Sequence, residues 1–355
     1  MIGEPLRIAV IPGDGIGVEV TAEAVKIVRR IGDVYGRRFE LAVMPWGAEH
    51  YLKTGETIPP DGYTLLRDQF DAVFVGALGD PRVPDNRHAR DILLGTRFEL
   101  DLYVNQRPVR LLDDRLCPLK GRTVADVSFT VFRENTEGLY VGIGGRFKAN
   151  TDDEVAVQEE INTYKGVNRI VRHAFQFARA NGGQRVCMAD KSNAMADGHA
   201  LWQRVFKQVA AEYADIAARH LYIDALALLM VQDPSQFQVI VTNNLFGDII
   251  TDLGAALQGG LGVAASGNLH PGRTSMFEPV HGSAPLLAGR NVANPIGAIL
   301  STAMMLECVG LKTEAASIER AVEEVVRTDN VTTDIGGSLG TRETGDSIAN
   351  AIRAG

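Results

Sequence analysis

Short apolar runs alternate with longer segments of helical periodicity along most of the chain. Residues 7–11 form a β-branched run, and residues 18–31 repeat their apolar positions as a helix with one buried face does. The same alternation predicts further strands at 39–46, 71–77, 124–132, 185–189 and 237–242. It predicts further helices at 63–70, 167–180, 198–213, 295–309 and 314–326. This order indicates an α/β fold with helices packed on a mixed, largely parallel sheet.

The domain organisation is less visible, because no proline- or serine-rich linker interrupts the chain. Loop-rich zones are expected at 79–90 and 259–279. The economical interpretation is a discontinuous first domain, residues 1–102 plus 259–355, with a second domain, residues 103–258, inserted between its parts. We therefore expect two domains in a chain of 355 residues.

Residues 143–165 have a different pattern from the rest of the second domain. The segment is polar and its apolar residues alternate, with Val155 and Val157 two positions apart and Ile161 beyond them. Alternation with a period of two is typical of a strand with one exposed face. The segment is predicted to be a hairpin-like arm outside the core.

Composition excludes several classes of protein. Apolar residues make up 45% and charged residues 23%, which is typical of a globular protein, and the net charge of −8 does not favour binding to nucleic acid. Neither a signal peptide nor an apolar stretch long enough to span a bilayer is apparent in the sequence. The three cysteines, Cys117, Cys187 and Cys308, are odd in number, far apart and in or near apolar stretches, so they are expected to be buried free thiols in a cytoplasmic protein rather than a disulfide framework or a zinc site.

The strongest chemical signal follows the predicted strand 237–242. Asp248 and Asp252 are four residues apart at the start of a predicted helix, so both carboxylates lie on one face, one turn apart. An arbitrary pair of this kind is usually solvated, but Phe246, Ile249 and other apolar residues surround this one. Carboxylate pairs suit Mg²⁺ or Mn²⁺, so the pattern predicts a metal-assisted active site at the end of a strand.

A glycine-rich segment links the first predicted strand to the first helix. Its glycines, Gly13, Gly15 and Gly17, do not have the spacing of the Rossmann fingerprint, which requires a third glycine at position 18. The segment is therefore predicted to be a tight strand-to-helix turn rather than a dinucleotide-binding loop, which is the alternative.

Arginines gather near the predicted strand ends. Arg97, Arg107 and Arg110 lie in one segment, and Arg133 follows the strand predicted at 124–132. A guanidinium group matches a carboxylate with two parallel hydrogen bonds. Although a single arginine is more often a surface charge, several of them near a metal site indicate a substrate with more than one carboxylate.

Six motifs resemble the β-decarboxylating dehydrogenases, the family of isocitrate and isopropylmalate dehydrogenases, over essentially the whole chain. The matching segments are 11–17 (IPGDGIG), Arg97 with 107–108 (RP), 133–140 (RENTEGLY), 190–193 (DKSN), 244–248 (NLFGD) and 278–285 (EPVHGSAP). Six segments in the right order are far more specific than any one of them. The resemblance implies the two-domain isopropylmalate dehydrogenase-like fold, which is not a Rossmann fold and so agrees with the spacing of the glycines.

The resemblance also implies roles for individual residues. Arg97, Arg107 and Arg133 would hold the malate-type carboxylates, Lys191 would accept the hydroxyl proton and Tyr140 would protonate carbon after CO₂ leaves. The metal ligands implied are Asp224, Asp248 and Asp252, with Asp224 and Lys191 reaching the site from the neighbouring subunit. The chain is therefore expected to act as a homodimer with shared active sites, clasped by the arm.

A nicotinamide cofactor is implied as well. The residues implied to bind it are Asn193, Glu278, His281, Gly282, Ser283, Ala284, Pro285 and Asn294. Leu286 stands where NAD-dependent relatives carry an acidic residue and NADP-dependent relatives a lysine. We expect NAD, because no cation replaces that lysine, with NADP as the open alternative.

The substrate is expected to be a small dicarboxylate of the malate type. Leu93 and Leu94 match the leucine pair of isopropylmalate and D-malate enzymes, which favours an apolar or absent side group. Arg90 stands where isopropylmalate enzymes have an acidic residue; it either admits an anionic group or points to solvent. The expected activity is 3-isopropylmalate dehydrogenase-like, with D-malate or tartrate as the main alternative. Isocitrate, homoisocitrate and a catalytically silent relative are further alternatives.

Overall fold

The computed structural model describes residues 4–354 and divides into two compact units, which are described separately. Unit 1 comprises Met1–Leu102, Arg110–Val124 and Ala255–Gly355, and unit 2 comprises Tyr103–Val109 and Ala125–Gly254. Compared with the predicted domains, the segment Arg110–Val124 lies in unit 1 rather than with the second domain. Residues 1–3 and 355 of the predicted first domain lie outside the described residues.

Unit 1 is built on five strands in the order β2-β1-β3-β12-β11. Its strands are β1 (Leu6–Ile11), β2 (Phe39–Val43), β3 (Ala72–Val75), β11 (Ala265–Leu269) and β12 (Ser275–Pro279). Strands β2, β1, β3 and β12 pair in parallel, and β11 runs antiparallel to β12. The helices are α1 (Ile16–Tyr35), α2 (Ala48–Thr54), α3 (Gly62–Gln69), α4 (Arg87–Arg90), α5 (Thr96–Glu99), α10 (Ile296–Cys308), α11 (Lys312–Arg327) and α12 (Thr341–Ala351).

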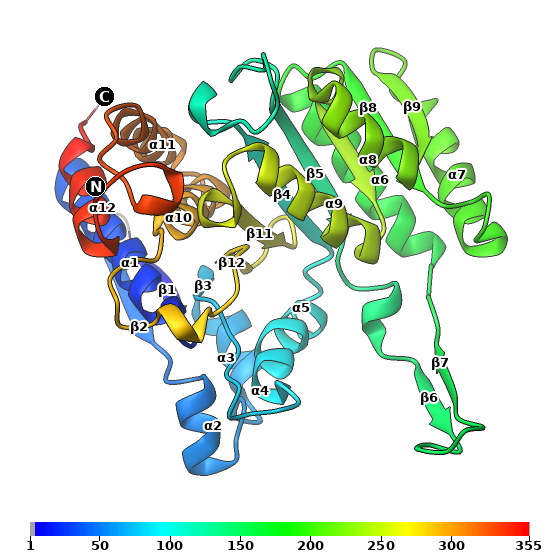
Figure 1. Ribbon diagram of the computed structural model, residues 1–355, viewed down its shortest axis with the longest axis horizontal. Helices are drawn as coiled ribbons and strands as arrows, with labels where there is room; N and C mark the ends of the chain where they lie inside the picture. The colour runs from blue at the N-terminus through cyan, green and yellow to red at the C-terminus, as the bar shows by residue number, and fades with distance from the viewer. Residues whose placement is uncertain (1–3, 355) are drawn as a thin grey trace. The chain divides into compact units, whose positions relative to one another are not determined.

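The helices of unit 1 pack by the periodicity that predicted them. In α1 the side chains of Val20, Ala24, Ile27 and Ile31 are buried, and they recur on one face of the helix. Helix α1 packs against α10 and α12, which lie beside it although they come from the other end of the chain (Figure 1). Burial of each Val or Ile side chain contributes about 1.5–3 kcal/mol to the free energy of unfolding.

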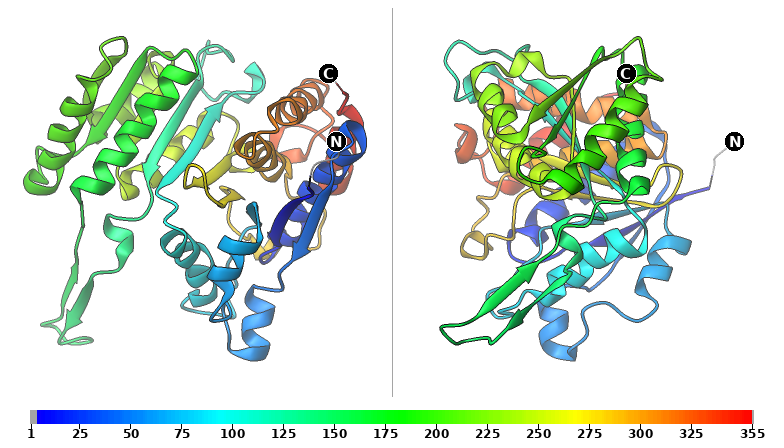
Figure 2. Two further views of the ribbon diagram at one scale, coloured as in Figure 1. Left: turned by 180° about the vertical axis from the view of Figure 1, so that it is seen from behind. Right: turned by 90° about the vertical axis from the view of Figure 1, so that its right-hand side faces the viewer.

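Unit 2 is a second α/β layer in which β4, β5, β10, β8 and β9 follow one another in the sheet. Its elements are β4 (Val104–Arg110), β5 (Ser128–Glu134), β6 (Gly144–Phe147), β7 (Val155–Gln158), β8 (Arg185–Asp190), β9 (Ala217–Tyr222), β10 (Val239–Thr242), α6 (Tyr164–Ala180), α7 (Ala196–Ala210), α8 (Ile223–Gln232) and α9 (Asn244–Leu257). Strands β5, β10, β8 and β9 pair in parallel. Helices α6 and α7 cover one face of this sheet and α9 lies on the other (Figures 1 and 2).

The segment predicted to be an arm forms a two-stranded antiparallel hairpin. Strands β6 and β7 pair from Gly144 with Gln158 to Phe147 with Val155. The hairpin extends away from the rest of unit 2 in both views (Figure 2). Phe147, Val155 and Val157 are about half exposed or more, which is unusual for apolar side chains in a regular element.

The structure corrects the prediction of a loop-rich zone at 259–279. That stretch contains β11 and β12, paired from Ala265 with Pro279 to Asn268 with Met276. The pattern was misleading because Ser266 and Asn268 interrupt the apolar run, yet both side chains are buried. Strands β4 and β9 were also missed, since β4 places the polar Asn105 and Arg107 at buried positions and β9 is largely exposed.

Candidate active site

The carboxylate helix α9 begins directly after the buried strand β10. The side chain of Asn243 caps it, because its Oδ1 accepts a hydrogen bond of 2.9 Å from the backbone N–H of Phe246. Asp248 and Asp252 follow on one face, as the spacing predicted, and their side chains are 38% and 63% exposed. The end of a parallel strand thus presents two carboxylates to solvent and to ligands.

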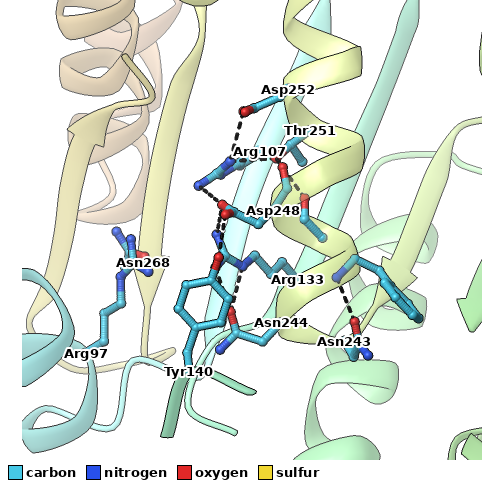
Figure 3. Close-up of polar contacts among 12 residues, drawn as sticks. Arg97, Arg107, Arg133, Tyr140, Asn243, Asn244, Asp248, Thr251, Asp252 and Asn268 are labelled. Atoms are coloured by element: carbon cyan, nitrogen blue, oxygen red, sulfur yellow. Dashed lines mark hydrogen bonds and ion pairs between the residues drawn. The ribbon is translucent and has the colours of Figure 1, made fainter. Parts of the chain in front are cut away.

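The carboxylate of Asp248 accepts hydrogen bonds from three side chains (Figure 3). Arg133 Nη1 lies 2.5 Å and Arg107 Nη2 3.4 Å from Oδ1. The hydroxyl of Tyr140 donates to Oδ2 at 2.6 Å. These residues belong to β4, to β5 and to the short 3-10 helix Leu139–Val141 that follows β5, so the fold brings two parts of the chain that are remote from α9 to one carboxylate.

Arg133 is held rigidly, although a guanidinium group is usually mobile. Its side chain is 1% exposed, and its Nε and Nη2 donate to Asn244 Oδ1 at 2.9 and 2.6 Å. Its Cζ lies 5.0 Å from the centre of the Tyr140 ring, a cation–π contact. A Cβ at Gly247 would come within 2.5 Å of Arg133 Cγ, so only glycine gives the arginine room to lie along α9.

Arg107 reaches the same helix one turn further on. Its Nη1 donates to Thr251 Oγ1 at 2.6 Å and lies 4.0 Å from Asp252 Oδ1. Burial raises the pKa of Asp252; Arg107 lowers it in part and the nearby Asp248 raises it further. The two arginines therefore offset the repulsion between the two carboxylates.

Lys191 and Asp224 form a separate pair within the chain. Lys191 follows β8, and its Nζ lies 2.5 Å from Oδ1 of Asp224 in the first turn of α8. The hydrogen bond from Lys191 holds the pKa of Asp224 below its ordinary value. Across residues 4–354, no three His, Cys, Asp or Glu side chains gather closely enough to hold a metal ion. The structure therefore does not unite Asp224 with Asp248 and Asp252 within one chain.

In unit 1 the buried Arg97 is bound to a carboxylate rather than free. Its Nη2 donates to Glu278 Oε1 at 2.8 Å, and Asn268 Nδ2 donates to the same oxygen at 2.8 Å. Leu93 and Leu94 precede Arg97 in a π-helical turn, Asp91–Gly95, and both are partly buried. Leu93 also packs against the hydrophobic core of unit 1, so core packing already explains part of its role.

The glycine-rich turn is bound to the loop 281–285, both within unit 1. Ile16 N donates to Ser283 O at 2.8 Å, and a Cβ on Gly15, whose φ is +55°, would come within 2.2 Å of that oxygen. Burial lowers the pKa of His281, whose buried Nε2 has no partner among the described residues. Ala284 adopts a left-handed φ of 36°, which is uncommon for a residue with a Cβ.

The remaining residues expected to bind the cofactor differ in exposure. Gly282, Pro285 and Asn193 are exposed, the last in the loop after Lys191. Asn294 is buried, and both ends of its amide are used: Nδ2 donates to Asp334 and Oδ1 accepts from Ile296 N, each at 3.0 Å.

Sequence reasoning missed several polar residues around Asp248. Asn244 and Thr251 orient the two arginines. Asn244 belongs to the NLFGD segment, and for Thr251 the only signal is its i,i+3 spacing from Asp248. The buried Glu134 was also missed. Burial raises its pKa to about 7, and it accepts hydrogen bonds from the backbone N–H groups of Thr136 and Glu137.

Parallel strands that end at paired carboxylates and buried arginines define an α/β enzyme, and comparison with known proteins identifies its class. The sequence profile of the isocitrate/isopropylmalate dehydrogenase family matches residues 7–348, and the chain belongs to this family. The 3-isopropylmalate dehydrogenases of Thermobifida fusca and Rhodococcus erythropolis are 43% and 45% identical to it, covering 99% and 98% of this chain and 99% and 100% of theirs.

A solved structure agrees with the family assignment. The crystal structure of isocitrate dehydrogenase from Methylococcus capsulatus superposes with a TM-score of 0.89 at 34% identity, covering 98% of this chain and 99% of that one. The resemblance inferred from the six motifs is confirmed, and so is the mixed, largely parallel α/β fold.

Proposed function

We propose that the chain catalyses the oxidative decarboxylation of a (2R)-malate-type 2-hydroxy acid to a 2-oxo acid, with reduction of NAD and with Mg²⁺ or Mn²⁺. The observation that carries the proposal is the cluster around Asp248, in which two arginines and a tyrosine meet a pair of carboxylates. The 3-isopropylmalate dehydrogenases at 43–45% identity support 3-isopropylmalate as the first substrate to test. D-malate and tartrate are the alternatives.

The carboxylate pair fits a hard divalent cation. Asp248 and Asp252 offer oxygen ligands one helical turn apart, and their side chains are 38% and 63% exposed, so both are open to a cation. We assign Asp248 and Asp252 of one chain and Asp224 of a second copy as the ligands. This division is consistent with the lack of a three-residue metal cluster among residues 4–354 of a single chain.

Unit 1 fits the adenosine end of a dinucleotide. The orphaned His281 Nε2 and the close approach of Gly15 to Ser283 describe a cradle whose backbone tolerates no extra Cβ. We assign Asn193, Glu278, residues 281–285 and Asn294 to cofactor binding, although Asn294 would have to exchange one of its present hydrogen bonds. Leu286 is 87% exposed and offers no partner to a 2′-phosphate, which favours NAD over NADP.

Each side chain would then have a defined task. Arg97, Arg107 and Arg133 bind the carboxylates of the substrate, and the last two exchange part of their contact with Asp248 for it. Lys191 accepts the proton of the C2 hydroxyl, and Tyr140 gives its hydroxyl proton to C3 after CO₂ has left. Asp248 and Asp252, with Asp224 of a second copy, would hold the cation that polarises the C2 oxygen, and a bound oxidised nicotinamide would supply the acceptor for the C2 hydride. Decarboxylation leaves electrons on C3, which the proton from Tyr140 neutralises.

The assignment of the substrate rests on Leu93, Leu94 and Arg90. The two leucines offer an apolar lining for an alkyl group. The Arg90 side chain is 71% exposed, and its Nε is 3.7 Å from Asp91, which favours the interpretation that it points to solvent. An apolar or absent substituent is therefore preferred over a third carboxylate.

We also propose a homodimer in which the arm clasps the second copy, because its exposed Phe147, Val155 and Val157 need an apolar cover. The three cysteines are free, which suits a reducing compartment, and we propose a cytoplasmic enzyme. The expectation that all three are buried is wrong, because only Cys187 is buried and Cys308 is exposed. No helix within residues 4–354 is long and apolar enough to cross a membrane.

The first test is reduction of NAD or NADP, followed by absorbance in the near ultraviolet, with Mg²⁺ or Mn²⁺ present. The substrates are 3-isopropylmalate, D-malate, tartrate, isocitrate and homoisocitrate. Preference for one of the first three supports the proposal. Preference for isocitrate or homoisocitrate would mean that a polar group recognises a third carboxylate, and Arg90 would be the first candidate for that role. Turnover of none of them would indicate an unusual anionic substrate or a silent relative.

The role of Lys191 has its own test. Replacing Lys191 with Ala removes the proton acceptor, so turnover should fall by at least about a hundredfold while the dimer persists. Size-exclusion chromatography with light scattering provides the control for assembly. Unchanged turnover in a dimeric Lys191→Ala enzyme would contradict the assignment of the base.

A further inference from the structure

A buried histidine binds the backbone of Lys191. His199 lies in the first turn of α7 (Ala196–Ala210) and its side chain is fully buried. Its Nδ1 is 2.7 Å from the backbone N of Lys191, which can only donate. Nδ1 must therefore carry a lone pair, so the ring is neutral and its proton is on Nε2.

The second ring nitrogen of His199, Nε2, also has a hydrogen-bond partner. His199 Nε2 is 3.2 Å from Oε2 of Glu160, which can only accept when ionised, so the Nε2 proton points to this carboxylate. The side chain of Glu160 is 8% exposed, and its Oε1 accepts a hydrogen bond of 2.6 Å from Asn243 Nδ2. The contact of 3.4 Å between Asn243 Nδ2 and His199 Nε2 joins two donors and is only van der Waals contact.

Asn243 connects this network to the carboxylate helix. It is the residue that caps α9 by accepting from the backbone N–H of Phe246. The ring of Phe246 in turn meets the His199 ring edge to face, with centroids 5.6 Å apart and an interplanar angle of 86°. The buried chain Lys191–His199–Glu160–Asn243 thus runs from the loop after β8 to the first turn of α9. Figure 3 shows Asn243 at the start of that helix.

Glu160 comes from the end of the arm segment, beyond β7. Its neighbour Asn162 accepts a hydrogen bond of 2.7 Å from Trp202 Nε1 in α7 and lies so close to Gly198 that a Cβ there would be 2.9 Å from Asn162 Nδ2. The base of the arm is therefore seated on the same first turns of α7 that carry His199. Two separate contacts hold it there.

We propose that His199, oriented by Glu160 and Asn243, is a positioning residue that fixes the backbone of Lys191 within its own chain, from which the Lys191 side chain reaches the site of the second copy. It acts through the backbone N–H of Lys191 and touches no substrate. The inference rests on the proposed function in that Lys191 is taken as the base. A displacement of the base by about 1 Å can cost on the order of a hundredfold in rate, so fixing its backbone has a direct consequence for turnover.

Two substitutions of His199 test the hydrogen bonds of Nδ1 and Nε2 separately. In His199→Asn, the side-chain oxygen can replace Nδ1 as the acceptor for Lys191, and the contact with Glu160 is lost. In His199→Gln, the amide nitrogen can replace Nε2 as the donor to Glu160, and the acceptor for Lys191 is lost. We expect kcat to fall by about ten- to a hundredfold in His199→Gln, with the KM values within about threefold of wild type, and to fall less in His199→Asn.

A histidine that merely fills the core would give a different result. Both variants would then lose stability, and Gln, which keeps more of the volume, would be at least as active as Asn. His173→Gln is the matched control, because His173 is a largely buried histidine of α6 in the same unit whose Nε2 has no partner among the described residues. Equal kcat values in His199→Gln and the wild type, or a lower kcat in Asn than in Gln, would overturn the proposal.

Two readouts do not depend on turnover. Long-range ¹H–¹⁵N NMR of the histidine rings in the full-length protein should show His199 neutral with its proton on Nε2; a proton on Nδ1 would overturn the proposal. Competitive labelling of lysines with acetic anhydride, read by mass spectrometry, gives the second readout. Lys191 should react at least about threefold faster in His199→Gln than in wild type, because a displaced Lys191 would lose its hydrogen bond to Asp224. The other lysines serve as internal standards, and an unchanged rate at Lys191 would contradict the positioning role.

These outcomes are separable from failure of the proposed function. If the wild type is active, Lys191→Ala is inactive and His199→Gln equals the wild type, only the positioning role is wrong. If the wild type turns over no malate-type substrate, the proposed function is wrong, and the tautomer and labelling results still decide whether His199 holds Lys191.

Discussion

Asp248 accepts hydrogen bonds from three side chains that lie far from it in the sequence. Arg107, Arg133 and Tyr140 together satisfy this one carboxylate. Under the proposed function, the substrate and the cation would enter by exchange of these partners. This exchange would cost the buried arginines little conformational entropy, because hydrogen bonds to Asn244 and Thr251 already fix their side chains.

Asp248 is therefore the first residue to substitute in a test of metal binding. Asp248→Asn should weaken Mn²⁺ binding by about a hundredfold or more, since even outer partners of metal ligands are worth about ten- to a hundredfold. Titration calorimetry of the whole enzyme with Mn²⁺ measures this. Asp68→Asn, an exposed residue of unit 1, is the control and should bind Mn²⁺ as the wild type does. Equal affinities would remove Asp248 from the metal site.

His173 predicts a dependence of stability on pH. Burial lowers its pKa to about 4, below its ordinary value of 6.5. The unfolded chain therefore binds a proton below pH 6.5 that the folded chain does not bind until about pH 4, so the contribution of His173 is present above pH 6.5 and is lost as pH falls toward 4.

Melting temperatures of the wild type and His173→Gln between these pH values provide the measurement. Gln carries no titrating group, so acidification should lower the melting temperature of the wild type more than that of the variant. The expected extra loss is about 2–4 °C. A difference that is constant with pH would show that His173 titrates normally in the folded protein.

At the scale of elements, the turn between β1 and α1 is fixed by contact with a distant loop. Gly15 has φ +55°, and its missing Cβ leaves room for Ser283 O, so the turn and the loop 281–285 hold each other's backbone in place. The pattern of three glycines predicted a tight turn, but the partner of that turn became visible only in the structure.

Gly15→Ala should weaken NAD binding by about tenfold or more, because the new Cβ must push Ser283 and its loop away. Calorimetry of NAD binding to the whole enzyme tests this. Gly36→Ala is the control: Gly36 also has a positive φ, +64°, but nothing lies within 4 Å of its Cβ position. The control should lose about 1 kcal/mol of stability and keep its NAD affinity. Equal affinities in both variants would contradict the cradle.

The arm illustrates a second lesson at this scale. Its alternating apolar residues predicted a hairpin outside the core, and β6 and β7 form one. The apolar side chains of these two strands are exposed in the single chain. Since isolated two-stranded hairpins are only marginally stable in water, we expect another surface to cover them. Glu160 and Asn162, at the end of the same segment, tie it to α7.

At the scale of the molecule, Lys191 and Asp224 of one chain pair with each other, and residues 4–354 form no three-residue cluster that could hold a metal ion. A two-fold symmetric dimer would resolve this if each site took Lys191 and Asp224 from the other copy.

Complementation tests this arrangement. Lys191→Ala and Asp248→Asn homodimers should each be nearly inactive. When they are mixed, unfolded and refolded together, random pairing should restore roughly a quarter of the wild-type activity, because half of the dimers are mixed and each has one intact site. Each variant refolded alone is the control. No recovery, with mixed dimers demonstrated by mass spectrometry, would show that Lys191 and Asp248 serve the same chain.

The sequence by itself determined the class of fold, the main helices and the position of the carboxylate pair. These follow from local rules: buried faces repeat with the period of the element, and Asp248 and Asp252 must share a helix face. The six motifs determined the family, which the comparisons confirm. Polar interruptions hid β11, because Ser266 and Asn268 look like loop residues and are buried instead.

Only the tertiary structure decided which partners the polar groups take. Arg97 meets Glu278, Arg133 meets Asn244, and His199 meets the backbone of Lys191, across separations that no local pattern encodes. A hydrophobic side chain requires only some apolar neighbour, so its periodicity is sufficient to predict burial. A buried donor or acceptor requires one partner at one distance and angle, and the packing of distant elements supplies it.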